Sequence, residues 1–180
     1  MKRRVLAFLC ALVLVISAFT SFACAARPAM HDRYGFTATD SAFLKEFKRL
    51  LEYNKCYFTM DLVEDFSDSN AKYYDMYGED GEYAMTIVLY TDNKTRILET
   101  IRFYCEEESF SKLGEGKRLF GMKVAFLTVN PNMDDDKWEE MFSKDTWSDD
   151  GYVKGYFGEF DHVSYSLTIQ DENYVEFSIT

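Results

Sequence analysis

The stretch from Glu82 to Glu106 reads EYAMTIVLY, TDNKT and RILETIRFYCE, which are two strand patterns on either side of a short polar segment. In the first arm both alternating sets of side chains are apolar, a pattern typical of a strand inside a sheet. In the second arm one set is mostly apolar (Ile97, Glu99, Ile101, Phe103 and Cys105) and the other is polar (Arg96, Thr100 and Arg102). Asp92 and Asn93 tolerate the positive φ angles of a tight connection. The stretch therefore predicts an antiparallel hairpin whose second strand shows one face to a core.

Three further elements are predicted before this hairpin. A helix begins at Asp40 or Ser41 and ends at Asn54, because apolar residues recur there at helical spacing while the opposite side is charged. A strand from Cys56 to Phe66 alternates apolar and polar side chains, and a short tyrosine-rich strand follows over residues 71–77. Together with the hairpin, these strands predict a four-stranded antiparallel meander that follows one helix.

The second half of the chain loosely repeats this order. Residues 117–129 are mostly apolar and long enough for a buried helix, although a strand fits the same composition, and Asn130-Pro131 ends the element. A short helix is predicted from Asp134, and strands follow around residues 153–157, 163–170 and 174–179. The predicted fold class is therefore α+β, with an antiparallel sheet (the meander plus a C-terminal hairpin) packed by two or three helices.

The N-terminus has the three regions of a secretory signal: Lys2-Arg3-Arg4, an apolar run over residues 5–19, and the small-residue segment TSFACAA. Three outcomes are open. Ala23-Cys24-Ala25 fits cleavage before Ala26. The segment ending in Ala23-Cys24 resembles the signal of bacterial lipoproteins, with Ser21 where that family usually has leucine, and lipidation would fall on Cys24. The uncharged run is also long enough to remain as an uncleaved anchor. All three predict export to the cell envelope or beyond it.

Length and sequence pattern divide the chain into three predicted parts. Residues 1–25 are assigned to the signal. Residues 26–38 contain Pro28 and Gly35 without periodicity and are predicted to be a tether. Residues 39–180 have the size of one domain.

The chain carries a net charge of −11, and the part after residue 25 carries −14, because the signal holds three basic residues and no acidic one. Such a surface repels phosphate groups, so nucleic acid is excluded as a partner. Contact with a membrane is expected only through the N-terminal signal or a lipid anchor.

Two cysteines, Cys56 and Cys105, lie in the predicted domain. Export makes a disulfide between them chemically possible, and closing a loop of about 50 residues would contribute roughly 4 kcal/mol in the chain-entropy model. The alternative is two buried side chains that pack as small apolar groups.

The common catalytic motifs are absent from this sequence. Asp161-His162 has no nucleophile motif beside it, and His31 is the only other histidine, so neither a catalytic triad nor a zinc site is predicted. Ser109 to Lys112 match the S-x-x-K nucleophile pattern by chance, since its partner motifs are missing. The acidic runs lack the ligand spacing of a calcium loop. We therefore expect no metal and no cofactor.

Aromatic residues make up 17% of the chain, and they gather in two places. Tyr73, Tyr74 and Tyr77 lie in one strand, and a second group lies near Gly151, Gly155 and Gly158, which let the backbone bend or be approached closely. Rings beside such glycines can anchor a protein or a sugar. The candidate binding residues are Trp147, Tyr152, Tyr156 and Phe157. The alternative is a bulged edge strand whose rings are buried.

The signal, the helix that Asn130-Pro131 ends, and the tyrosine-rich final hairpin resemble those of small exported proteins and lipoproteins of Gram-positive bacteria. The repeated order of helix and meander is similar to that of tandem secreted inhibitor domains of the β-lactamase-inhibitor type, as an analogy of architecture. The predicted function is non-catalytic binding of an envelope protein or polysaccharide by a secreted or surface-tethered protein. The alternative is an extracellular hydrolase that uses carboxylates, which needs two carboxyl groups in a cleft and a raised pKa.

Overall fold

The computed structural model describes residues 29–66, 70–106, 117–133, 136, 138–139, 148–149, 153–170 and 174–180. The predicted signal peptide and Cys24 lie outside these ranges. The helices are α2 (Asp40–Tyr53) and α4 (Lys117–Val129), and the strands are β1 (His31–Asp32), β2 (Gly35–Phe36), β3 (Thr59–Phe66), β4 (Ala71–Tyr77), β5 (Tyr83–Thr91), β6 (Leu98–Glu106), β7 (Ser148–Asp149), β8 (Val153–Phe160), β9 (Val163–Gln170) and β10 (Tyr174–Ile179).

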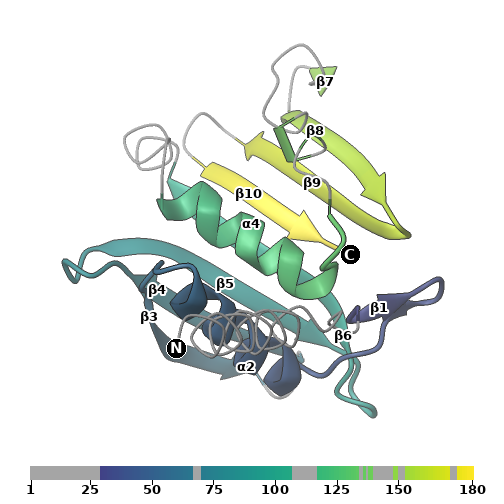
Figure 1. Cartoon of the computed structure of the whole chain (residues 1–180), viewed down its shortest axis with the longest axis horizontal. Helices are drawn as coiled ribbons and strands as arrows, with labels where there is room; N and C mark the ends of the chain where they lie inside the picture. The colour runs from purple at the N-terminus through teal and green to yellow at the C-terminus, as the bar shows by residue number, and fades with distance from the viewer. Residues whose placement is uncertain are drawn as a thin grey trace, which may run out of the picture.

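One antiparallel sheet runs through both halves of the chain, in the order β3-β4-β5-β6-β10-β9-β8-β7, and a small β1–β2 sheet stands beside it. Both α2 and α4 lie over the same face of the large sheet (Figure 1). The predicted α+β class, with a meander and a C-terminal hairpin in an antiparallel sheet, is confirmed.

The helices begin and end where the sequence predicts. Thr39 caps α2, since its hydroxyl accepts a hydrogen bond from the Ala42 N–H at 3.3 Å, and Asn54 follows the last turn. Phe43, Phe47 and Leu51 are buried on the inner side of α2. Residues 117–129 form a helix and not a strand, which decides between the two alternatives that composition left open.

The predicted hairpin over residues 82–106 is confirmed as β5 and β6, but the geometry of its turn was predicted wrongly. The residue with positive φ is Arg96, at 59°, and not Asp92 or Asn93. Asp92 has a different role, because its carboxylate accepts hydrogen bonds from the N–H groups of Lys94 and Thr95. The connection is therefore longer than a tight two-residue turn, and a capping carboxylate holds it.

The first predicted strand needs two corrections. It begins at Thr59 and not at Cys56, and a bulge between Leu62 and Glu64 interrupts its alternation. Leu62, which lies on the apolar side of this alternation, is 52% exposed on the edge strand of the sheet. Bulges are common on edge strands, where they disturb an open row of backbone hydrogen-bonding groups.

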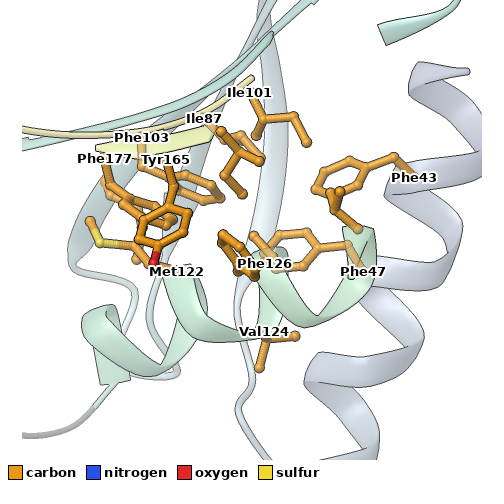
Figure 2. Packing of buried hydrophobic residues seen from close by; sticks show 14 of the residues in the cluster. Phe43, Phe47, Ile87, Ile101, Phe103, Met122, Val124, Phe126, Tyr165 and Phe177 are labelled. Atoms are coloured by element: carbon orange, nitrogen blue, oxygen red, sulfur yellow. The ribbon is translucent and has the colours of Figure 1, made fainter. Parts of the chain in front are cut away.

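The two halves join where the last strand of each half pairs, so that Phe103 of β6 lies opposite Phe177 of β10. The ring centroids of this pair are 6.1 Å apart, and Phe47 of α2 packs on Phe103 at 6.2 Å. Phe126 of α4 contacts Tyr165 of β9 at 5.0 Å. Figure 2 shows these rings gathered between the helices and the sheet. The single core therefore lies on one face of the sheet and leaves the other face without a covering helix among the described residues.

Candidate functional site: the helix-free face of the sheet

We call the side of the large sheet that points away from α2 and α4 the open face. Strand register places its side chains in rows across the sheet. One row runs through Tyr73, Val88, Arg102, Ser178, Ser166 and Phe157, and the next through Asp61, Asp75, Thr86, Tyr104, Glu176, Thr168 and Gly155. On β4 to β6 these rows include Tyr73, Arg102 and Tyr104, whereas on β10 and β9 they include Ser178, Ser166 and Thr168 together with Glu176.

Five tyrosines on the first half form what we call the tyrosine cluster: Tyr73, Tyr77, Tyr83, Tyr90 and Tyr104. Their rings are half-buried, apart from Tyr83, which is 40% exposed. The rings of Tyr77 and Tyr83 meet edge to face at 6.2 Å. Burial raises the pKa of the Tyr73 hydroxyl, and its hydrogen bond with Tyr90 adds to the rise. The contacts hold these rings in place before any partner binds.

Arg102 lies in the middle of the open face and joins the cluster to β10. Its guanidinium carbon is 5.3 Å from the centroid of the Tyr90 ring, and its Nη1 donates to the Tyr104 hydroxyl at 3.3 Å. Its Nε is 3.6 Å from a carboxylate oxygen of Glu176 and makes no hydrogen bond, although that atom is buried. Val88, which lies opposite both Tyr73 and Arg102 in the register, is fully buried. The long side chains around Val88 therefore cover it.

A chain of hydroxyl groups ends on a carboxylate at one end of the cluster. Thr86 donates its only hydroxyl hydrogen to Asp75 at 2.7 Å, so the Tyr83 hydroxyl, 2.8 Å from the Thr86 oxygen, is the donor to Thr86. Asp61 of the edge strand lies directly opposite Asp75. Two carboxylates are thus neighbours on the open face, and the hydroxyl chain fixes the position of one of them.

The half of the open face formed by β8, β9 and β10 carries the hydroxyl groups of Ser166, Thr168 and Ser178. It contains a hollow of about 410 Å³ lined by Phe157, Gly158, Glu159, Ser164, Tyr165, Ser166 and Thr180. A second hollow of about 360 Å³ lies between the end of α2 and the start of β3, with Cys56, Phe58 and Met60 among its lining residues. Ser166 of the first hollow lies in the same row of the open face as Ser178 and Arg102, two strands away from Arg102.

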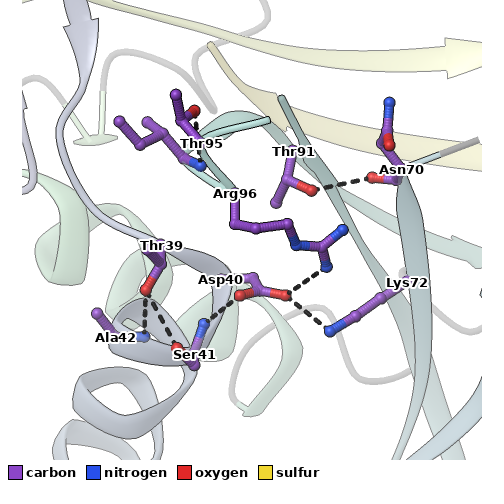
Figure 3. Close-up of polar contacts among 10 residues, drawn as sticks. Thr39, Asp40, Ser41, Ala42, Asn70, Lys72, Thr91, Thr95 and Arg96 are labelled. Atoms are coloured by element: carbon purple, nitrogen blue, oxygen red, sulfur yellow. Dashed lines mark hydrogen bonds and ion pairs between the residues drawn. The ribbon is translucent and has the colours of Figure 1, made fainter. Parts of the chain in front are cut away.

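A polar cluster elsewhere in the chain has a structural role. Asp40, at the first turn of α2, is 2.9 Å from the Lys72 ammonium of β4 and 3.3 Å from the Arg96 guanidinium (Figure 3). Burial alone would raise the pKa of Asp40, but the hydrogen bonds from Lys72 and the Ser41 N–H, with the charge of Arg96, hold that pKa below its ordinary value. The carboxylate is therefore ionised at neutral pH and ties α2 to the sheet.

The four binding residues predicted from the sequence do not form one exposed surface in the described part of the chain. Trp147 and Tyr152 lie outside the described residues. Phe157 is 62% exposed and belongs to the open face, but Tyr156 is only 8% exposed and stacks on Tyr165 at 6.0 Å in the core. The expectation of an exposed ring at Tyr156 is therefore corrected, because β8 alternates and its neighbour Phe157 takes the outer side.

The glycines explain this arrangement. A Cβ atom at Gly158 would lie 2.8 Å from the Tyr156 ring and 2.9 Å from the Tyr165 ring, and one at Gly155 would lie 2.6 Å from a backbone oxygen of β9. The glycines thus allow close packing between β8 and β9, whereas the sequence prediction assigned them to an exposed anchor surface.

The histidines lie closer together than their sequence separation indicates. His31 is buried in β1 within electrostatic range of Asp161 and His162 of the β8–β9 turn. Burial lowers the pKa of His31, and the nearby charge of Asp161 partly offsets that effect. Across the described ranges, no group of three or more His, Cys, Asp or Glu side chains is placed to hold a metal ion.

Cys56 and Cys105 are both buried in the core, and the structure contains no disulfide between them. The two side chains instead pack as the second sequence-based alternative describes.

Sequence reasoning grouped Tyr73, Tyr74 and Tyr77 as one candidate ring surface and assigned Arg102 to the polar side of its strand. In the structure Tyr74 packs against the core, whereas Tyr73 and Tyr77 lie half-buried on the open face with Tyr90 and Tyr104, which the sequence did not add to the group. The available signal was the shared alternation of three neighbouring strands.

Comparisons of the chain with protein-family models, curated proteins and solved structures returned no match. Within the described parts, no helix has the length and apolar character needed to span a membrane.

Proposed function

We propose that this chain is an exported, non-catalytic binding protein that holds a protein partner on its open face. The observation that carries the proposal is the tyrosine cluster with Arg102 at its centre. Tyrosine and arginine are the residue types that most often dominate binding energy at protein interfaces. Here they stand on the rigid strands of a sheet and are already held by mutual contacts, which lowers the entropy lost on binding.

A protein fits this surface better than a polysaccharide. Rings on one half and serine and threonine hydroxyls on the other give the open face the composition of an antibody paratope, in which tyrosine supplies contact area and small polar residues adapt their hydrogen bonds. The hydroxyl groups of Ser164, Ser166 and Ser178 can exchange hydrogen bonds with the N–H and C=O groups of a protein main chain.

The hydrolase alternative finds less support among the described carboxyl groups. A general acid at neutral pH needs a raised pKa. The shifted carboxyl groups are Asp40 and Asp92, and both pKa values are lowered: that of Asp92 by hydrogen bonds from Thr95 and Lys94, and that of Asp40 by the ionic contacts described above. Both groups stabilise local structure, so the open face is the better candidate for function.

The proposal is tested with purified envelope proteins and glycans immobilised as an array. Binding is measured for the wild type, for Tyr104→Ala on the open face, and for Tyr53→Ala as a matched control. Tyr53 is 76% exposed and lies on α2, on the opposite side of the sheet. We expect a protein ligand whose affinity falls at least about 30-fold with Tyr104→Ala, the equivalent of about 2 kcal/mol, and is unchanged with Tyr53→Ala. A ligand that both variants bind as the wild type does would overturn the assignment of the open face.

A further inference from the structure

We infer that the segment docking on the open face is basic, a stretch of protein that carries lysine or arginine side chains. This inference rests on the proposed function and adds the chemistry of the partner. It follows from the charges of the open face and from the way that its rings already hold a guanidinium group.

The described side chains of the open face carry mostly negative charge. Their carboxylates are Asp61, Glu64, Asp75, Glu159 and Glu176. The register places Asp61, Glu64, Asp75 and Glu176 next to the tyrosine cluster and Glu159 on β8, at the far side of the face. The cation among them is Arg102, which already contacts Glu176 and Tyr104. The whole chain adds to this field with its net charge of −11. A basic segment would be attracted to this face, and an acidic one would be repelled.

The pairing of Asp61 with Asp75 strengthens the argument. Like charges directly opposite each other on neighbouring strands destabilise a sheet. The Tyr83–Thr86 hydroxyl chain nevertheless holds the Asp75 carboxylate in place on the face. A lysine or arginine side chain of a partner would relieve the repulsion and would find an acceptor that needs no rearrangement.

The tyrosine cluster shows how such a side chain can be held. Arg102 lies over the Tyr90 ring at 5.3 Å and at the same time reaches a hydroxyl and a carboxylate. A cation near a tyrosine ring gains energy from the negative face of the ring, and the gain grows as water is excluded. The rings next to Asp75, Tyr77 and Tyr83, offer the same combination to a cation that arrives from outside.

The experiment selects ligands from a phage-displayed library of random peptides on the purified protein. Selected peptides are then measured against two double variants that remove the same charge. Asp61→Asn with Asp75→Asn neutralises the pair on the open face, and Glu46→Gln with Glu52→Gln neutralises two carboxylates of α2, on the other side of the sheet. Tyr104→Ala reports whether a peptide uses the open face at all. Circular dichroism and thermal melting confirm that each variant is folded.

We expect peptides rich in lysine and arginine whose affinity falls at least tenfold with the open-face double variant and less than twofold with the α2 double variant. Equal weakening by both would assign binding to net charge and would overturn the inference. Acidic or uncharged peptides that lose binding with Tyr104→Ala would also overturn it, while leaving the proposed function in place. Peptides whose affinity is unchanged by Tyr104→Ala would count against the proposed function itself. A selection that enriches no peptide above an empty surface would do the same.

Discussion

Asp40 offers the sharpest test of how the helix layer is held to the sheet. Its carboxylate contacts Lys72 at 2.9 Å and Arg96 at 3.3 Å and accepts the Ser41 N–H at 2.7 Å. Asp40→Asn removes the negative charge but keeps the size of the side chain and an oxygen for Ser41. The change therefore isolates the two ionic contacts, which join α2 to β4 and to the turn before β6.

The structure sets the expected magnitude. Exposed ion pairs contribute about 0–1 kcal/mol, whereas breaking a fully buried pair costs about 3–5 kcal/mol. The side chain of Asp40 is 9% exposed, but those of Lys72 and Arg96 are 24% and 39% exposed, so water screens their charges in part. We expect Asp40→Asn to lower the free energy of unfolding by about 2 kcal/mol, between these limits.

Urea denaturation at pH 7 measures this change. With a typical slope of roughly 2 kcal/mol per molar, the midpoint should fall by about 1 M at unchanged slope. Glu46→Gln is the control, since it breaks the pair with Arg49 on α2, whose side chain is 53% exposed, and should cost about 0.5 kcal/mol or less. A loss for Asp40→Asn no larger than that of the control would refute the reasoning.

The pH dependence of the same contact has a defined sign. The pKa of Asp40 in the folded protein is lower than its ordinary value of 3.8. Its contribution to stability is therefore present in full above that ordinary value, and it is lost as the pH falls through the pKa of the folded state. The difference in stability between the wild type and Asp40→Asn should accordingly shrink below about pH 4.

Three further predictions concern other residues. Gly158→Ala should lower the free energy of unfolding by about 1–3 kcal/mol, since its Cβ would press on Tyr156 and Tyr165, and an unchanged melting temperature would contradict the packing. The pKa of His31 is lowered by burial, with Asp161 and Asp32 opposing and His162 adding to the effect, so the wild type should lose stability as the pH falls through 6.5 and below. In His31→Phe that loss should be smaller in denaturation curves at pH 7.5 and 5.5, and equal losses would refute it. Cys56 and Cys105 should react with an alkylating agent only after unfolding, as mass spectrometry would show, and rapid labelling of the native protein would argue against their burial.

The sequence predicted the elements of this fold because their signals are local. The capped amphipathic pattern gave the bounds of α2, and alternation gave β9 and β10 to the residue. The turn between β5 and β6 was harder, because a carboxylate cap at Asp92 and a left-handed Arg96 are compatible with many sequences. The bulge between Leu62 and Glu64 in β3 likewise has no residue pattern that identifies it in the sequence.

The candidate site was harder to predict because it depends on pairing between distant strands. The pairing of β6 with β10 places Arg102 beside Ser178 and Glu176, more than 70 residues away, and no local pattern specifies that register. Alternation also assigns Tyr156 and Phe157 to opposite sides, but it does not say which side is covered until the helices are in place. The sequence prediction of exposed rings at both positions therefore held for Phe157 alone.

The central claim, that the open face is the binding surface, is tested most directly by ¹⁹F NMR of protein labelled with 3-fluorotyrosine. The 13 tyrosines each give a signal, which single Tyr→Phe variants assign. On addition of a selected peptide, we predict changes at Tyr73, Tyr77, Tyr83, Tyr90 and Tyr104, and none at Tyr34 and Tyr53, which are 81% and 76% exposed but lie off this face. Changes confined to Tyr34 or Tyr53, with the five signals of the tyrosine cluster unmoved, would contradict the claim.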